Sequence, residues 1–180
     1  YIMINFAIDN GGPNSNTVFP SNLEVDYVRV YQTEDIQGCT DINATNYNDQ
    51  ATLEDNSCIY EVTFNVNMNC SDENPETVYV SGGFNNWCGT CHPLSDNNGD
   101  GIWNGSYAFD QQVIEYKYII DNWASQEDLV DDMQNGASCA PVTDYFNYAN
   151  RQVSTAQGAV TVNDVDGQCE PCDQGCNDPI

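Results

Sequence analysis

The sequence predicts an all-β protein whose main part is an antiparallel β-sandwich. The first observation is a strict alternation of apolar and polar residues over 62–68, which gives a strand with one apolar face. The second is a series of further short strand-like runs separated by clusters of Asn, Asp and Gly, which are turn residues. The third is that these runs show no helical period, and short strands with turns between them are typical of a sandwich.

The strands of this module can be assigned in order within residues 61–168. In the first strand, the apolar face is formed by Val62, Phe64, Val66 and Met68. The runs that follow are 77–81, 101–109, 113–120, 151–154 and 159–165. The last two runs are expected to supply the final pair of strands, which completes the predicted sandwich.

The first 33 residues form a separate segment. An apolar run at 1–8 and a turn-rich loop at 9–20 precede an alternating run at 23–31. Two strands cannot make a stable domain alone, so they belong either to the same small domain as the sandwich or to another domain. Because the chain starts within a strand-like run, without Met or a signal peptide, we expect it to be a piece of a longer polypeptide.

The run at 25–32, Val-Asp-Tyr-Val-Arg-Val-Tyr-Gln, resembles the last strand of family 16 glycoside hydrolases, the laminarinase and agarase jelly rolls. This resemblance implies that residues 1–33 are the C-terminal strands of a truncated jelly roll. The catalytic run of that family, of the type Glu-x-Asp-x-x-Glu, does not occur in this sequence, so no residue is assigned to catalysis. The parent chain is then expected to be a glycoside hydrolase that acts on O-glycosyl bonds.

The charge of the chain excludes two classes of partner. It carries 28 acidic and 3 basic residues, a net charge of −25. Such a chain repels nucleic acid and anionic membranes, so we expect neither as a partner. The acidity fits a secreted protein of a salty or calcium-rich medium, and equally a surface that is acidic only for solubility. No run of about 18 apolar residues is present, so the sequence predicts no transmembrane helix.

Nine cysteines at recurring spacings predict disulfides and a secreted or cell-surface location. Two C-x-x-C pairs, one at 88–91 and one at 169–172, could also be zinc ligands. The gap between them is far longer than the about 15–20 residues of a compact zinc ribbon, so disulfides are preferred. The sequence leaves open the pairing of Cys70, Cys88, Cys91, Cys139, Cys169 and Cys172.

Residues 38–59 form a segment bracketed by two cysteines, and the end of the chain, residues 175–180, starts in the same way. The segment resembles a linker repeat of secreted multimodular bacterial proteins. The resemblance implies one disulfide, Cys39–Cys58, because about twenty residues rich in Asn, Asp and Thr cannot bury a core. It also implies that 169–180 is linker and the start of a second repeat, with a partner for Cys176 beyond residue 180.

The linker repeat is acidic, and its carboxylates could hold calcium, which prefers clustered oxygens. The carboxylates concerned are Asp41, Asp49, Glu54 and Asp55. No complete ligand spacing is present, so a solvated acidic linker is the preferred interpretation.

Two tryptophans lie in turns directly after strand-like runs. Trp87 ends Val-Tyr-Val-Ser-Gly-Gly-Phe-Asn-Asn-Trp, and Trp123 ends Glu-Tyr-Lys-Tyr-Ile-Ile-Asp-Asn-Trp. A flat aromatic at the exposed end of a strand is a surface on which sugar rings stack. These motifs, in this order, are similar to those of starch- and glycogen-binding modules of families 20 and 48, including the glycogen-binding domain of AMP-activated kinase β subunits. The resemblance covers about 100 residues and implies an immunoglobulin-like (E-set) β-sandwich.

The same resemblance implies which residues bind sugar. The tryptophans of those families stack on consecutive glucose rings, while a Lys and an Asn bond sugar hydroxyls. The matching positions here are Trp87, Lys117, Trp123 and Asn150. Lys117 offers three donors, and Asn150 can both donate and accept. The structural alternatives are a core position for either tryptophan, and an ion pair with Glu115 or with an acidic residue of the next strand for Lys117.

Residues 96–101, Asp-Asn-Asn-Gly-Asp-Gly, match the opening of a calcium-binding loop. The expected ligands are Asp96, Asn98 and Asp100 through their side chains and Ile102 through its carbonyl. The twelfth position holds Tyr107 instead of the required Glu. Asn and Gly are also the natural residues of a hairpin turn, which is the favoured interpretation.

The expected function is non-catalytic polysaccharide binding that targets an attached secreted glycoside hydrolase to its substrate. Binding modules usually recognise what their enzyme cuts, so the family 16 resemblance favours β-1,3-glucan such as laminarin, with α-glucan second. Residues 121–148 exceed the corresponding family loop and can reshape the groove beside Trp123. The alternative is a structural or adhesive cell-surface spacer, held by disulfides and calcium, that binds no sugar. Exposure of both tryptophans on one face would favour binding.

Overall fold

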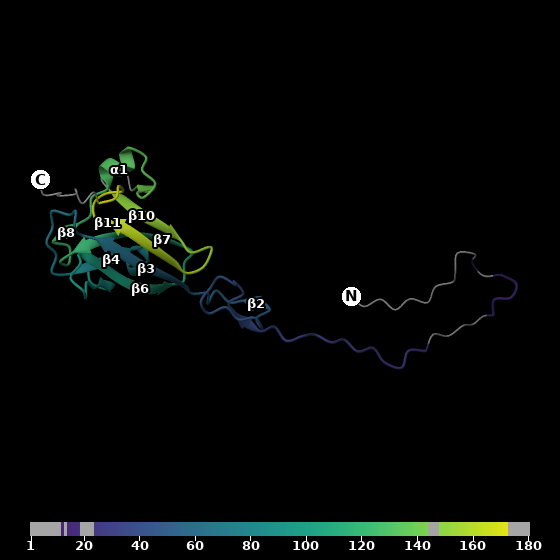
Figure 1. Cartoon of the computed structure of the whole chain (residues 1–180). Coiled ribbons are helices and arrows are strands. Elements are labelled where there is room, and N and C mark those ends of the chain that lie inside the picture. Colours follow the sequence, from purple (N-terminus) through teal and green to yellow (C-terminus); the bar gives the residue numbers. More distant parts are fainter. Residues whose placement is uncertain (1–11, 13, 19–23, 144–147, 173–180) are drawn as a thin grey trace, which may run out of the picture. The chain divides into compact units, whose positions relative to one another are not determined.

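The structure, a computed structural model, describes residues 12, 14–18, 24–143 and 148–172. The chain divides into two compact units, Tyr1–Glu34 and Asp35–Ile180. Figure 1 shows the ribbon of the whole chain, and each unit is described by itself below.

The described part of the first unit contains no strand. The strand expected at 23–31 is therefore wrong for residues 24–31, where Val25, Tyr27 and Val28 are exposed to solvent. The physical reason is that a strand needs a neighbour to pair its N–H and C=O groups, and the described residues of this unit supply none. The run at 1–8 lies outside the described residues, and the jelly-roll interpretation of residues 1–33 stays a prediction.

The second unit contains a sandwich of two β-sheets (Figure 1). The larger sheet has the strand order β5-β4-β7-β10-β9, and β8 also pairs with β7. Its strands are β4 (Val78–Gly82), β5 (Pro93–Leu94), β7 (Val113–Ile120), β8 (Ser125–Gln126), β9 (Val142–Thr143) and β10 (Ala149–Ser154). The smaller sheet has the order β11-β3-β6 and is formed by β3 (Tyr60–Asn67), β6 (Ile102–Phe109) and β11 (Val160–Val165).

The alternation of apolar residues builds the core between the sheets. Phe64 of β3 is fully buried, and its ring meets those of Tyr116 and Phe109 edge to face, with centroids 5.0 and 6.1 Å apart. Since side chains alternate along a strand, burial of Tyr116 in this core places its neighbours Glu115 and Lys117 on the outer face of the larger sheet. The predicted all-β sandwich is therefore confirmed, and its outer face carries polar groups.

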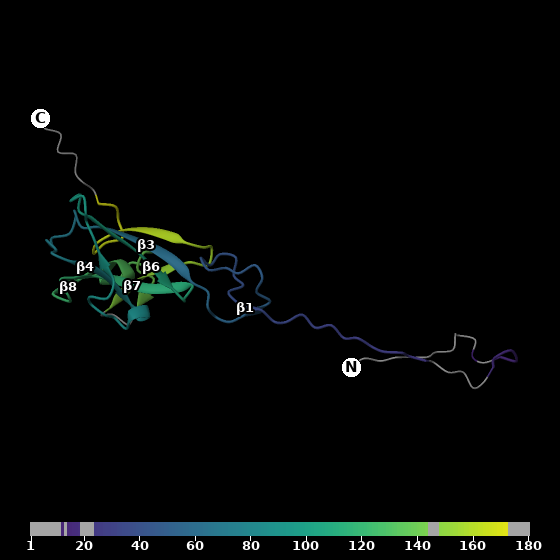
Figure 2. The ribbon, with the colours of Figure 1, turned by 90° about the horizontal axis from the view of Figure 1, so that it is seen from below.

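All the runs predicted for the sandwich correspond to strands, with ends that differ by no more than two residues. Several features were not predicted, among them the short strands β5, β8 and β9. The strands β10 and β11 do not pair with each other but lie in opposite sheets, and β11 runs parallel to β3, beside which it lies in Figure 2. A short helix, α1 (Val130–Gln134), and a 3-10 turn, η1 (Gly83–Asn85), interrupt the strands. A parallel partner that is about a hundred residues away leaves no trace in the local alternation that predicts strands.

The linker repeat has its own small sheet of β1 (Gln37–Gly38) and β2 (Leu53–Glu54), which pair in parallel. The expected disulfide Cys39–Cys58 is present. The other bridges are Cys70–Cys172, Cys88–Cys91 and Cys139–Cys169. The C-x-x-C pairs therefore form no zinc site, because their sulfurs are bonded to one another or to other cysteines. Cys176 lies outside the described residues.

The helices that the structure describes are too short and too polar to cross a membrane. The longest regular elements of the second unit are instead the strands β3, β6 and β7.

Candidate functional site

A groove with a volume of about 620 Å³ opens on the outer face of the larger sheet, around β7 and β10. All four residues expected to bind sugar line this groove. The complete lining is Trp87, Glu115, Lys117, Trp123, Gln126, Val142, Tyr148 and Asn150. The structure thus brings together side chains from four strands and from the two tryptophan turns.

Trp87 lies in the loop that follows β4, and the side chain of Asn85 fixes that loop. The Asn85 carbonyl oxygen accepts the backbone N–H groups of Gly82 at 3.0 Å and Cys88 at 3.2 Å. The Asn85 amide nitrogen lies 3.0 Å from Nδ1 of His92. The Trp87 N–H donates to the Gly82 carbonyl at 3.0 Å, so both ends of the loop are held by hydrogen bonds. Trp87 is half-buried, with its side chain on the groove.

Trp123 lies in the turn after β7, and the carboxylate of Asp121 fixes that turn. One oxygen of Asp121 accepts the backbone N–H groups of Glu76 at 3.0 Å and Thr77 at 2.7 Å. The Asp121 N–H in turn donates to the Thr77 carbonyl at 3.0 Å. Trp123 itself is 42% exposed, which is unusual for so large an apolar side chain.

Both tryptophans have a left-handed backbone. Their φ angles are 58° at Trp87 and 70° at Trp123, and Asn86 and Asn122 before them are left-handed as well. This region is strongly disfavoured for bulky side chains and costs about 1 to 3 kcal/mol per residue. Two such residues at one groove indicate that the turns are held in place for the position of the indoles, since strained backbone concentrates at functional sites.

Lys117 is almost completely buried at the floor of the groove, at 5% exposure. Its ammonium group donates to the amide oxygen of Gln126 at 3.2 Å, and Gln126 is its only hydrogen-bond partner among the residues that the structure describes. The expected alternative, an ion pair with Glu115, is not formed. Burial lowers the pKa of Lys117, while the carboxylates of Glu127 and Asp128 act against that shift. The ammonium group has three N–H donors, and one of them is used in this bond to Gln126.

Asn150 is paired with Glu115 across the β7–β10 ladder. The Asn150 amide nitrogen donates to a Glu115 carboxylate oxygen at 2.6 Å, and Asn150 is 5% exposed. An ionised carboxylate can only accept, so the amide nitrogen of Asn150 must face it. The side-chain oxygen of Asn150 is then the atom of this amide that is not bonded to Glu115.

The sequence did not identify the remaining lining residues. Glu115 stands two positions before Lys117 in the same strand, so the period of a strand could have placed it on the same face. Gln126 follows the turn of Trp123, and Val142 and Tyr148 belong to or flank the long segment after it. No local pattern marks these three, because they reach the groove only when the chain folds back to form β8 and β9.

The predicted calcium loop forms a hairpin turn between Ser95 and Asn104, which exchange two backbone hydrogen bonds of 2.9 and 3.0 Å. The Asp96 carboxylate accepts backbone N–H groups of Gly99 at 2.8 Å and Gly101 at 2.9 Å. Asp100 accepts the N–H of Ile102 at 2.9 Å. These bonds agree with the turn interpretation, and the calcium ligands Asp96, Asn98, Asp100 and Ile102 stay a prediction.

The acidic groups of the linker repeat are likewise engaged by hydrogen bonds. Asp41 accepts from the Tyr60 hydroxyl at 2.7 Å and from the Gln112 amide at 2.8 Å. The backbone N–H of Asn43 and then the Tyr60 hydroxyl hold the pKa of Asp41 below its usual value. Glu54 accepts the backbone N–H of Thr40 at 2.8 Å. These carboxylates therefore hold the linker by hydrogen bonds, and whether they also bind calcium stays a prediction.

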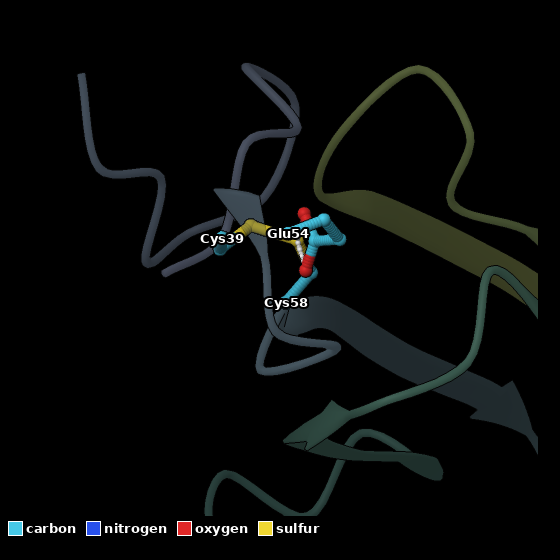
Figure 3. A group of neighbouring side chains, drawn as sticks. All are labelled: Cys39, Glu54 and Cys58. Carbon is cyan, nitrogen blue, oxygen red and sulfur yellow. Dashed lines mark hydrogen bonds between the residues drawn. A yellow bond between two sulfur atoms is a disulfide. The ribbon is translucent and has the colours of Figure 1, made fainter. Parts of the chain in front are cut away.

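Figure 3 shows Cys39, Glu54 and Cys58 close together in the linker repeat. This group of potential ligands is not a metal centre. Both sulfurs belong to the Cys39–Cys58 disulfide, so neither cysteine can supply the thiolate that a metal needs. The carboxylate of Glu54 alone is no cation site.

A buried ion cluster lies on the core side of the larger sheet. Arg151 pairs with Glu127 at 2.9 Å and with Asp164 at 3.1 Å, and the side chains of Arg151 and Glu127 are 2% and 0% exposed. The hydroxyls of Tyr116 and Tyr118 each donate to Asp164 at 2.8 Å. Burial raises the pKa of Glu127, against the opposing charge of Arg151. These contacts join β7, β10 and β11, and none of these residues lines the groove.

Comparison with known proteins finds one family model that matches part of the sandwich. Residues 60–133 match the family described as carbohydrate-binding module 48, the isoamylase N-terminal domain. This match covers the two tryptophan turns and Lys117, and it indicates a non-catalytic carbohydrate-binding module. No curated protein matches the chain.

Two solved structures are similar to parts of the chain. One is the glycoside hydrolase family 15 glucoamylase from Hypocrea jecorina, with 21% identity over 61% of this chain and 17% of that one, at a TM-score of 0.38. The other is the glucoamylase of Hormoconis resinae, with 21% identity over 63% of this chain and 18% of that one, at a TM-score of 0.38. The chain therefore spans less than a fifth of either glucoamylase. None of these matches supports the family 16 resemblance, which stays a prediction.

Proposed function

We propose that the sandwich binds a polysaccharide in the groove between Trp87 and Trp123, without catalysis. In this account the two indoles stack on sugar rings, while polar groups on the floor of the groove bond the hydroxyls. The observation that carries the proposal is the pair of tryptophans held with left-handed backbones at one groove. The sequence resemblance to starch- and glycogen-binding modules and the match to family 48 support it independently.

The polar floor of the groove suits a ligand rich in hydroxyls. Lys117 contributes donors, and the carbonyl of Asn150 contributes an acceptor. A hydroxyl both donates and accepts, so it can bond to each of these groups at once. Apolar ring faces combined with a few fixed polar groups are the usual composition of a small-ligand site.

The proposed ligand is an α-glucan. The family 48 match favours this class, because the resemblance that predicts Trp87, Lys117, Trp123 and Asn150 is to modules that bind starch and glycogen. The earlier preference for β-1,3-glucan depended on the family 16 resemblance of residues 1–33, which no comparison supports. Laminarin is therefore the second candidate, and targeting of an attached hydrolase is part of the same proposal.

A structural spacer without a ligand is the alternative. Four disulfides, together with carboxylates that accept hydrogen bonds from groups of the protein itself, suit such a role. It gives no reason, however, for Trp123 to be 42% exposed beside Trp87 at the same groove. The exposure of this indole therefore favours binding.

The proposal is tested by electrophoresis of the whole chain in native gels that contain amylose, glycogen or laminarin. We expect retardation by amylose and glycogen, and loss of that retardation in Trp123→Ala and Trp87→Ala. The matched control is Tyr47→Ala, which removes an aromatic side chain of similar exposure, 43%, from the linker repeat. It should migrate like the unsubstituted chain.

The gels also separate the candidate ligands. Retardation by laminarin alone would replace α-glucan by β-1,3-glucan as the ligand. Retardation by none of the three glycans would overturn the binding function and leave the spacer.

A further inference from the structure

The indole of Trp123 rests against Gly89, a buried residue of the loop that carries Trp87. A β-carbon added to Gly89 would lie less than 3.0 Å from Cδ1 and Nε1 of Trp123. It would also lie 3.0 Å from the side-chain oxygen of Asn122. The pyrrole edge of the indole thus packs directly on the backbone of Gly89, where no other residue type leaves room.

Gly89 belongs to a short closed loop, residues 88–91, which we call the Gly89 loop. The disulfide Cys88–Cys91 closes it. On one side the Cys88 N–H donates to Asn85, which also anchors the turn of Trp87. The Gly89 loop therefore begins directly after one tryptophan and supports the other.

We propose that Gly89 and the Cys88–Cys91 bridge are positioning elements of the groove, which hold Trp123 at a fixed place relative to Trp87. The inference rests on the proposed function, because it assigns Gly89, Cys88 and Cys91 a role in glycan affinity. Neither Gly89 nor the disulfide lines the groove itself. Both act through the indole of Trp123.

The physical reason is preorganisation. Trp123 is 42% exposed, so few side chains pack around its indole. Without the contact to Gly89, the indole would have to be ordered when the ligand binds, at a cost in affinity. Two stacking rings serve consecutive sugar units only if their spacing is fixed before binding. A loop of four residues closed by a disulfide can provide this because its backbone has few accessible conformations.

The first test substitutes Gly89→Ala in the whole chain and uses Gly83→Ala as the matched control. Gly83 lies in the turn before Trp87, and an added β-carbon there meets no atom within 4 Å. We expect Gly89→Ala to weaken binding of maltoheptaose by roughly tenfold, because the displaced indole must be ordered again. Gly83→Ala should bind like the unsubstituted chain.

The second readout is the indole N–H resonance of each of the three tryptophans in a ¹⁵N-labelled chain, recorded without ligand. Gly89→Ala should shift the Trp123 resonance and leave that of Trp103, which packs against the core, in place. A merely structural defect would move both. An unchanged Trp123 resonance together with unchanged affinity would overturn the inference.

A second variant decides the case in which Gly89→Ala does not fold. Cys88→Ser with Cys91→Ser removes the bridge and adds no atom at Gly89. We expect the same selective shift of Trp123 and weaker maltoheptaose binding, and normal affinity of this double variant would overturn the role of the bridge. If the unsubstituted chain binds no glycan, the proposed function fails; if it binds and Gly89→Ala binds equally well, only this inference fails.

Discussion

The amide nitrogen of Asn150 donates to the carboxylate of Glu115 at 2.6 Å, across the two central strands of the larger sheet. The bond fixes the orientation of an amide that would otherwise be able to rotate by half a turn. In the proposed binding function, this bond leaves the amide oxygen of Asn150 to accept from a sugar hydroxyl, and Glu115 acts through Asn150.

The first prediction concerns this orientation. Glu115→Gln keeps the size of the side chain, but its amide can donate as well as accept, so Asn150 is no longer held in one orientation. We expect glycan affinity to fall by about 1 kcal/mol, the usual worth of one hydrogen bond, measured by calorimetry. Glu61→Gln is the control, because Glu61 is exposed on β3 in the other sheet. Equal affinity of the two variants would contradict the orienting role.

The second prediction concerns His92, the only histidine of the chain. The Asn85 oxygen accepts from Gly82 and Cys88, so the Asn85 amide nitrogen faces Nδ1 of His92, which must accept and therefore be unprotonated. Burial lowers the pKa of His92 below its usual 6.5. Titration of the His92 ring proton by NMR should give a pKa below that value, and a pKa above it would contradict the arrangement.

The same titration has a consequence for stability. A base whose pKa is lowered on folding stabilises the protein above its unfolded pKa, and this contribution is lost as the pH falls from 6.5 through the folded pKa. Burial raises the pKa of Glu127, so protonation of this carboxyl stabilises the folded state as the pH falls. Over part of this range, this effect opposes that of His92. The difference in unfolding free energy between the unsubstituted chain and His92→Gln isolates the histidine. It should shrink as the pH falls below 6.5.

The third prediction concerns the buried ion cluster. Arg151→Met leaves the carboxylate of Glu127 without its partner at 0% exposure. Removal of one partner of a buried pair costs about 3–5 kcal/mol, so chemical denaturation should show a loss of this size. Adding Glu127→Gln should restore part of the stability. A loss below about 1 kcal/mol would show that the cluster is not coupled as its geometry requires.

The fourth prediction concerns the hairpin turn at Asp96. Because its carboxylate accepts two glycine N–H groups, Asp96→Ala should destabilise the sandwich by about 1–2 kcal/mol. If the turn interpretation holds, addition of calcium or of EDTA should leave the melting temperature unchanged. A clear rise in melting temperature with calcium, lost in Asp96→Ala, would favour the calcium interpretation instead.

The fold was predictable where neighbours in sequence decide it. The alternation of β3 and the apolar run of β7 mark strands whose side chains pack in the core, and their ends were placed within two residues. The parallel pairing of β11 with β3 was not predictable. The local sequence of β11 marks it as a strand, but it does not show which of the two sheets the strand joins. The run at 24–31 shows the reverse case, in which alternation without a partner strand forms no strand.

The groove was predictable where a motif marks it and hidden where only folding brings residues together. Trp87, Lys117, Trp123 and Asn150 were found through a family resemblance, and they share one groove. Gly89 leaves no such trace, because its contact with Trp123 is a close approach of backbone to a side chain from another turn.

The most direct test of the account is a titration of the ¹⁵N-labelled whole chain with maltoheptaose, in which the three indole N–H resonances are followed. The resonances of Trp87 and Trp123 should shift together and with one dissociation constant, while that of Trp103 stays in place. Shifts confined to Trp103, or no shift at any indole with either maltoheptaose or laminariheptaose, would contradict binding at this groove.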